Sequence, residues 1–134
     1  MAAMGRDAYL RDSLETASPG RIVVMLYDTA VRDLAVAERA LESGEHAVAN
    51  GRLVHAQAIL LELYGMLDVA AWEGAPTLAN LYLFLVRELI DANVGRDQEK
   101  IATCRGMLES LAQVWQEALM ITGDVRTALV GSGR

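Results

Sequence analysis

The clearest indication of the fold lies in residues 97–122, DQEKIATCRGMLESLAQVWQEALMIT. Mostly apolar side chains recur there at steps of three and four, which is the period of an α-helix with one buried face. This stripe consists of Ile101, Cys104, Leu108, Leu111, Trp115, Leu119 and Thr122. Asp97 stands just before the stripe, and aspartate is a residue type that caps helix N-termini. We therefore predict an amphipathic helix that follows Asp97 and ends near Thr122.

Three more helices are predicted upstream, each separated from the next by a turn signal. Ser18 is placed to cap a helix over residues 19–42, because Pro19 suits the first helical position. Two further helices are expected over residues 45–71 and 76–93, with glycine or proline in the turns between them. The predicted buried positions of the first two are Ile22, Leu26, Ala30, Leu34, Ala37 and Leu41, then Val48, Ile59, Leu63, Met66 and Ala70.

Helices joined by such short turns pack as antiparallel neighbours, and no window alternates with the period of two that marks a strand. We therefore predict an all-α protein, an antiparallel four-helix bundle formed as one domain by residues 1–122. Within it, residues 1–17 are expected to be a loose, mobile N-terminal segment, and residues 123–134 a disordered C-terminal tail. A chain of 134 residues that is 53% hydrophobic can bury a core without disulfides or metal.

The charge and hydropathy of the chain exclude several classes of partner. The net charge is −6, from 18 acidic and 12 basic residues, and no basic stripe is present, so neither nucleic acid nor an anionic membrane is an expected partner. No uncharged apolar run approaches the roughly 20 residues of a membrane span, so no membrane insertion is expected. Residues 1–13 carry four charges where a signal peptide needs an apolar core. The expected location is the cytoplasm (cytosol).

No pattern in the sequence supports catalysis. Cys104 shares its helical face with apolar residues, so we interpret it as a core residue rather than a nucleophile. His46 and His55 are nine residues apart, which is not the spacing of a metal-ligand pair on one helical face, and we expect them at the surface. Motifs for nucleotides or zinc are missing, as is the Glu-x-x-His pair of metal-carrying bundles. We therefore expect no catalytic residue, no cofactor, no metal site and no enzyme activity.

The last two helices carry more apolar surface than one bundle seam needs. In residues 76–93, Leu78, Leu85 and Leu89 form one stripe, and a second stripe lies beside it. The additional apolar residues are Ala79, Leu83, Val86 and Ile90 in the third helix and Met107, Val114, Ala118 and Ile121 in the fourth. They either pack against neighbouring helices or line a groove for an external amphipathic segment or the chain's own N-terminus.

The order of several short motifs resembles the FliS family of flagellar secretion chaperones. The similarity covers most of the chain and is most specific in residues 16–19 (TASP) and 25–28 (MLYD), while Gly20-Arg21 departs from the polar helix formers usual in the family. The other matching positions are Tyr9, Ala56, Ile59, Glu62-Leu63, Leu67-Asp68, Ala79-Asn80-Leu81-Tyr82, Ala92-Asn93, Asp97 and Trp115.

The resemblance implies a cytosolic protein that binds flagellin before export. In this family the C-terminal segment of flagellin, disordered in the monomer, wraps the bundle and folds into short helices against its apolar grooves. The cargo is thereby kept from premature polymerisation and competent for type III secretion, and the chaperone's own N-terminal tail can occupy part of the groove. The candidate partner-binding residues are Tyr9, Leu10, Ile22, Leu26, Tyr27, Tyr82, Leu83, Val86, Ile90, Met107 and Val114.

An alternative is a structural helical bundle that self-associates through its spare apolar stripes. The flagellin C-terminal segment separates the two, because a chaperone forms a 1:1 complex with it and a structural bundle does not. We expect a monomer or weak homodimer, with the flagellar export gate as a second candidate partner. Tyr27 lies one position round from Leu26, at the edge of the core stripe. We therefore expect its ring to be buried while its hydroxyl reaches solvent or a partner.

Overall fold

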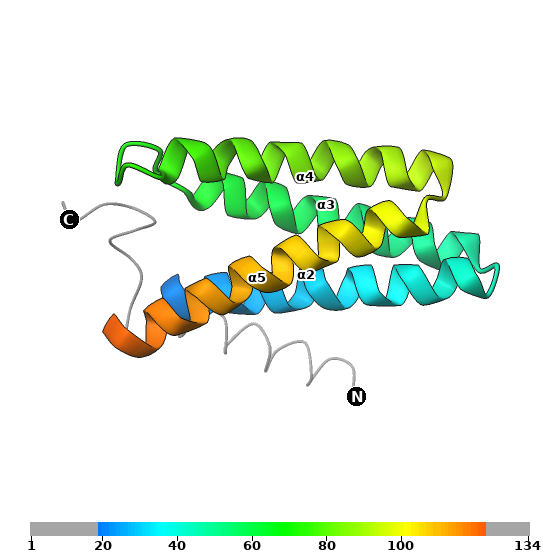
Figure 1. The fold of residues 1–134 in the computed structure, drawn as a ribbon, viewed down its shortest axis with the longest axis horizontal. Coiled ribbons are helices and arrows are strands. Elements are labelled where there is room, and N and C mark those ends of the chain that lie inside the picture. Colours follow the sequence, from blue (N-terminus) through cyan, green and yellow to red (C-terminus); the bar gives the residue numbers. More distant parts are fainter. Residues whose placement is uncertain (1–18, 123–134) are drawn as a thin grey trace, which may run out of the picture.

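The computed structural model describes residues 19–122. Four helices account for most of this range: α2 (Pro19–Glu42), α3 (His46–Met66), α4 (Ala75–Gly95) and α5 (Gln98–Thr122). Successive helices run in alternating directions, and α5 lies at an angle to the others (Figure 1). Residues 19–122 contain no strand. The predicted antiparallel four-helix bundle is confirmed, whereas the expectations for residues 1–17 and 123–134 lie outside the described residues.

The core occupies the centre of the bundle. Helix α2 packs against α3 and α5, and α4 packs against the same two helices from the other side. Large side chains from every helix are completely or almost completely buried there, namely Tyr27, Leu34, Leu53, Leu60, Leu63, Tyr82, Leu85, Leu89, Ile101 and Leu108. Each helix packs against two others, so the buried part of its surface is broad rather than a single narrow stripe.

Helix α5 forms as its period predicts. Asp97 accepts a hydrogen bond on Oδ1 from the backbone N–H of Lys100 at 3.0 Å, which satisfies one of the free donors of the first turn. Cys104 and Trp115 are 2% and 6% exposed and belong to the core. Burial raises the pKa of the Cys104 thiol to about 11, which keeps it protonated and unreactive near neutral pH. The interpretation of Cys104 as a core residue is confirmed.

Helix α3 is shorter than predicted. It ends at Met66 instead of residue 71, because Leu67 takes an extended conformation and buries its side chain in the core. Asp68 then stabilises a turn, since its Oδ1 accepts from the backbone N–H of Ala70 at 3.0 Å. The buried face is also different, so Val48 and Ala70, predicted to be buried, are exposed. The buried residues are Ala49, Leu53, Ala56, Ile59, Leu60 and Leu63.

The first two turns of α2 bury a different stripe from the predicted one. Val23 and Tyr27 are fully buried, whereas Ile22 and Leu26 are only half-buried. Helix α2 packs against both α3 and α5. The middle of the buried face of α2 therefore points between α3 and α5. Ile22 and Leu26 therefore lie at the edge of α2, where their side chains help to line a groove.

Candidate functional site

An apolar groove, which we call the α2–α3 groove, lies between two antiparallel helices. Its volume is about 500 Å³. The lining residues are Ile22 and Leu26 from α2 and Ala58, Ile59, Glu62 and Met66 from α3. Their spacing of three or four residues places them one above another on each helix, so that the groove follows the helix axes.

The depth of the groove comes from the sizes of its lining side chains. Ile59 is 6% exposed and belongs to the core, while Leu26 and Met66 pack against the core from the rim. Ala58 has a short side chain, which leaves space where a larger residue would fill the groove. With five apolar side chains and one carboxylate, the groove can bury the apolar face of another segment, a process worth roughly 25 cal/mol per Å² of apolar surface.

A partly buried ion-pair cluster around Asp33 joins α2 to α3 beyond this groove. Asp33 is fully buried, yet each carboxylate oxygen has a partner. Its Oδ1 accepts from Nη1 of Arg52 at 2.9 Å, and its Oδ2 lies 2.5 Å from Nδ1 of His55. His55 is one turn from Ile59, about 6 Å along the helix axis. His55 lies at the surface as expected, but its contact with a buried carboxylate was not evident from the sequence.

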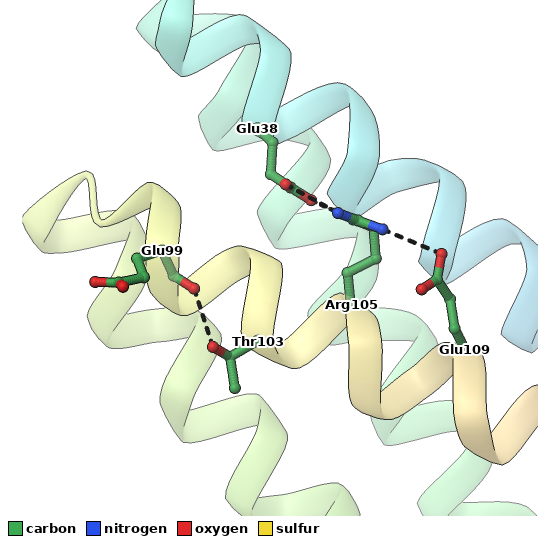
Figure 2. A network of polar contacts seen from close by, with 5 residues as sticks. All are labelled: Glu38, Glu99, Thr103, Arg105 and Glu109. Carbon is green, nitrogen blue, oxygen red and sulfur yellow. Dashed lines mark hydrogen bonds and ion pairs between the residues drawn. The ribbon is translucent and has the colours of Figure 1, made fainter.

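A second ion-pair network joins α2 to α5. Figure 2 shows Arg105 between Glu38 and Glu109: its Nε and Nη2 donate to the two oxygens of Glu38, and its Nη1 donates to Glu109 at 3.1 Å. The two carboxylates raise the pKa of the Arg105 guanidinium further above its usual value, Glu38 contributing most. Because both oxygens of Glu38 are engaged, this pair fixes the position of α5 along α2.

Tyr27 and Tyr82 do not lie at the surface of the bundle. They are 0% and 1% exposed, and their hydroxyl oxygens are 2.7 Å apart. Nε1 of Trp115 donates to the Tyr27 hydroxyl at 3.1 Å. Burial is the main cause that raises the pKa of both hydroxyls. The Tyr27 ring is buried as expected, but the expectation that its hydroxyl reaches solvent is wrong, because Tyr82 of α4 and Trp115 of α5 are its hydrogen-bond partners.

The other predicted site residues lie on α4 and α5 and do not line the α2–α3 groove. On α4, Val86 is 9% exposed and belongs to the core, Leu83 is half-buried, and Ile90 is 44% exposed. On α5, Met107 packs half-buried against the core, and Val114 is 61% exposed. Tyr9 and Leu10 lie outside the described residues. Of the predicted residues within the described range, Ile22 and Leu26 line the α2–α3 groove.

Exposed or half-buried apolar side chains of α3 and α4 lie at matching levels of these two helices. Nδ2 of Asn93 donates to Oδ1 of Asn50 at 2.7 Å, which fixes the register of these antiparallel helices. Because the helices are antiparallel, one turn towards the C-terminus of α3 is one turn towards the N-terminus of α4. Val54 and Ile90 are therefore at the same level, and Leu61 and Leu83 share a level about two turns further in that direction. We call Val54, Leu61, Leu83 and Ile90 the α3–α4 strip; Val54 and Leu61 are 51% and 49% exposed.

Sequence reasoning missed several of these residues. Ile59 is in the core as predicted and Met66 packs against it, but neither was predicted to line a groove, and Val54, Ala58 and Leu61 were not singled out at all. The signal that could have identified them is that α3 carries apolar residues on opposite faces of the helix. Ile59 and Leu61, two positions apart, cannot both belong to one buried face.

The described residues contain no cluster of three histidine, cysteine, aspartate or glutamate side chains that could hold a metal ion. Among the helices of residues 19–122, none has the length and apolar content that crossing a membrane requires.

The fold is that of a small antiparallel four-helix bundle with an apolar groove between α2 and α3. A family model described as flagellar protein FliS matches residues 1–122, and the chain belongs to this family. It is 30% identical over 122 residues to the flagellar secretion chaperone FliS of Salmonella typhimurium (strain LT2), covering 86% of this chain and 90% of that relative. It is 29% identical over 112 residues to the flagellar secretion chaperone FliS of Bacillus subtilis (strain 168), covering 84% of each. This is a family of chaperones rather than enzymes.

Proposed function

We propose that this protein is a cytosolic export chaperone that binds the C-terminal segment of flagellin. In this role it prevents premature polymerisation and keeps the cargo competent for type III secretion. Membership of the FliS family supports the chaperone role. The observation that carries the proposal is the α2–α3 groove, in which Ile22, Leu26, Ile59 and Met66 present an apolar surface.

A segment that folds when it docks must recover the entropy lost on ordering, so its affinity depends on a large apolar contact area. The α2–α3 groove and the α3–α4 strip together offer such an area. They lie on two sides of α3, so a long cargo segment that wraps this helix reaches both. Ile22 and Leu26 are proposed as anchors in the groove, and Leu83 and Ile90 as contacts in the strip.

The remaining predicted contacts divide by burial into surface residues and supporting residues. Val114 is exposed on α5 and available to cargo, with Met107 beside the core. Tyr9 and Leu10 are proposed to dock in a cargo site when cargo is absent. Tyr27, Tyr82 and Val86 are buried, so we propose that they support the binding surfaces from beneath.

Calorimetric titration with the flagellin C-terminal segment tests the proposal. We expect a 1:1 complex with the parent chain. Ile22→Ala or Leu26→Ala should weaken binding by about 1–3 kcal/mol, a tenfold to hundredfold loss, as for an apolar anchor at an interface. Met120→Ala is the control, because this side chain is 85% exposed and lies outside both surfaces. Absence of a complex, or parent-like binding by both groove variants, would contradict the proposal.

Self-association is the second candidate, and the exposed α3–α4 strip favours it. Sedimentation of the free chain over a range of concentrations distinguishes the two roles. A chaperone remains a monomer or weak homodimer and binds cargo, whereas a structural bundle forms a stable assembly that Leu61→Ser disrupts. We also propose the flagellar export gate as a second candidate partner, which would bind the complex of the chaperone and its cargo.

A further inference from the structure

Helix α3 carries a second apolar face, on the side opposite its buried residues. The residues of this face follow one another at steps of four and three, which is the spacing of a coiled-coil seam. All of them are exposed and none is charged. A Cβ added at Gly51 or Gly65 meets no atom within 4 Å, so both positions face open space. We call this set the outer α3 face: Ala47, Gly51, Val54, Ala58, Leu61 and Gly65.

The sizes of these side chains suit a second copy of the same chain. When two copies of α3 lie antiparallel about a two-fold axis beside Ala56, Leu61 of one copy is level with Gly51 of the other. Val54 is likewise level with Ala58. A leucine–glycine layer and a valine–alanine layer contain the same number of side-chain carbons, so the two helices keep a constant separation.

A parallel pair has no such match. Each residue then meets its own copy, so the layer formed by Leu61 holds two large side chains and the layer formed by Gly51 holds none. The helices would have to separate at one layer and approach at the other. The order of large and small residues on the outer α3 face therefore favours the antiparallel arrangement.

The charges beside the outer α3 face favour the same arrangement. Glu62 is exposed on the flank nearer α2. In the antiparallel pair this flank meets the same flank of the other copy, where Glu62 is about 3 Å from the level of Arg52 and about 7.5 Å from that of His55. Helical side chains lean towards the N-terminus of their helix, so Glu62 and His55 lean towards each other.

Arg52 and His55 are accessible to a carboxylate of another copy. Both contact the buried carboxylate of Asp33, yet their side chains are 46% and 58% exposed. A guanidinium has five N–H donors, so the contact with Asp33 leaves donors of Arg52 for Glu62 of the other copy. In a parallel pair Glu62 would meet the opposite flank, which carries the uncharged side chains of Asn50, Gln57 and Tyr64.

We propose that the free chain pairs with a second copy of itself through the outer α3 face, with the two α3 helices antiparallel. The face is about 27 Å long and about 10 Å wide. It is therefore smaller than the roughly 800 Å² that each partner buries in a stable interface. The pair is weak and reversible, unlike the stable assembly that a structural bundle would form.

The pair covers part of both proposed cargo surfaces. Ala58 also lines the α2–α3 groove, and Val54 and Leu61 also belong to the α3–α4 strip. A chain held in the pair cannot present these residues to cargo, so cargo and the second copy compete for α3. This competition rests on the proposed function, whereas the pairing does not.

Two cysteine variants measure the direction of pairing. Position 47 of one copy is level with position 65 of the other in the antiparallel pair. Oxidation of an equal mixture of Ala47→Cys and Gly65→Cys should therefore give a disulfide-linked dimer. Each variant alone should give little, because its two cysteines are about 27 Å apart. The parent chain is the matched control, since its Cys104 is buried.

Two results of this experiment would overturn the proposal. Crosslinking of each variant alone as readily as the mixture would show a parallel pair. Crosslinking of the mixture no better than the parent would show that the outer α3 faces do not meet.

Sedimentation equilibrium at concentrations up to about 1 mM measures the strength of the pair. Gly51→Leu places a leucine opposite Leu61 of the other copy and should raise the Kd of the dimer about tenfold or more. Adding Leu61→Ala to this variant restores a large residue opposite a small one and should bring the Kd back towards that of the parent. Gly106→Leu is the control, because a Cβ at this position of α5 also meets no atom within 4 Å.

Circular dichroism checks that these variants fold. A parent chain that remains monomeric at every concentration would overturn the proposal. Equal dimer Kd values for Gly51→Leu and Gly106→Leu would overturn it too.

Addition of the flagellin C-terminal segment to the crosslinking mixture tests the competition. The yield of linked dimer should fall as the fraction of chaperone bound to the segment rises. An unchanged yield with a segment that binds would overturn the competition and leave the pairing intact. A segment that does not bind in the titration would contradict the proposed function, and with it the competition, while the crosslinks of the chain alone still decide the pairing.

Discussion

The hydroxyl oxygens of Tyr27 on α2 and Tyr82 on α4 lie 2.7 Å apart in the centre of the bundle. Because Trp115 of α5 also donates to Tyr27, one hydrogen-bonded cluster joins three helices. Among the described residues, no buried side-chain nitrogen or oxygen lacks a partner. Every polar side-chain atom of the cluster therefore has a hydrogen-bond partner. Removing one member costs more stability than the loss of its packing alone, because it leaves the other polar groups buried without a partner.

Tyr27→Phe should destabilise the protein by about 1–3 kcal/mol, because it leaves both the Trp115 N–H and the Tyr82 hydroxyl buried without their partner. Tyr82→Phe should cost less, since the Trp115 N–H keeps its acceptor. Chemical denaturation of the two variants and the parent gives the comparison. Equal stability of Tyr27→Phe and the parent would show that the Tyr27 hydroxyl is not part of a satisfied buried cluster.

Stability should decrease at alkaline pH. Burial raises the pKa of Cys104 from its usual 9.0 to about 11, so the unfolded chain loses this proton before the folded chain does. A raised pKa contributes stability that is complete below pH 9.0 and is lost as the pH rises to about 11. Cys104→Ala should therefore flatten the decrease in the free energy of unfolding over this interval. An identical pH profile for the variant would refute the assignment.

Helix α5 could be predicted from the sequence because its apolar period is regular and Asp97 is a strong cap. The C-terminus of α3 could not, because the turn depends on Leu67 entering the core rather than on a local breaker. The α2–α3 groove could be predicted only in part, on its α2 side. Ile22 and Leu26 were recognised as apolar, but which neighbour lies beside them depends on how the helices are arranged around α2, and a single helical period does not contain that information.

The Asp33 cluster should respond non-additively to substitution. Arg52→Ala or His55→Ala alone leaves the buried carboxylate one partner and should cost about 0.5–1.5 kcal/mol. The double variant leaves an uncompensated buried charge, for which the expected cost is about 3–5 kcal/mol. Urea denaturation of the four proteins of this cycle measures the coupling. Costs that simply add would mean that the two partners do not share the stabilisation of Asp33.

Gly74 should resist substitution for a steric reason. A Cβ at this position would lie 2.2 Å from the ring of Trp72, although its φ of −84° suits any residue. Because the Trp72 ring is 39% exposed and can move, Gly74→Ala should destabilise the α3–α4 turn by at most about 1 kcal/mol. Gly51→Ala is the control, because it meets open space inside α3 and should stabilise by about 0.5–1 kcal/mol. Thermal melts that rank the two variants in the reverse order would exclude the steric explanation.

The α3–α4 strip should separate binding from folding on a single helix. Ile90 is 44% exposed and Leu85 is fully buried, although both are large apolar residues of α4. Ile90→Ala and Leu83→Ala should each leave the free energy of unfolding within about 1 kcal/mol of the parent. The change should be larger for Leu83→Ala, because Leu83 is half-buried. Leu85→Ala should cost about 2–5 kcal/mol through the lost transfer energy and the cavity left behind. The measurement is chemical denaturation of the three single variants.

Calorimetric titration with the flagellin C-terminal segment completes this experiment. If the strip contacts cargo, Ile90→Ala and Leu83→Ala should weaken binding by about 1–3 kcal/mol while the proteins remain as stable as the parent. Leu85→Ala, measured at a temperature where it is folded, should bind nearly as the parent does, because its side chain reaches no surface. A Leu83→Ala protein that unfolds as easily as Leu85→Ala and binds cargo normally would remove Leu83 from the strip and return it to the core.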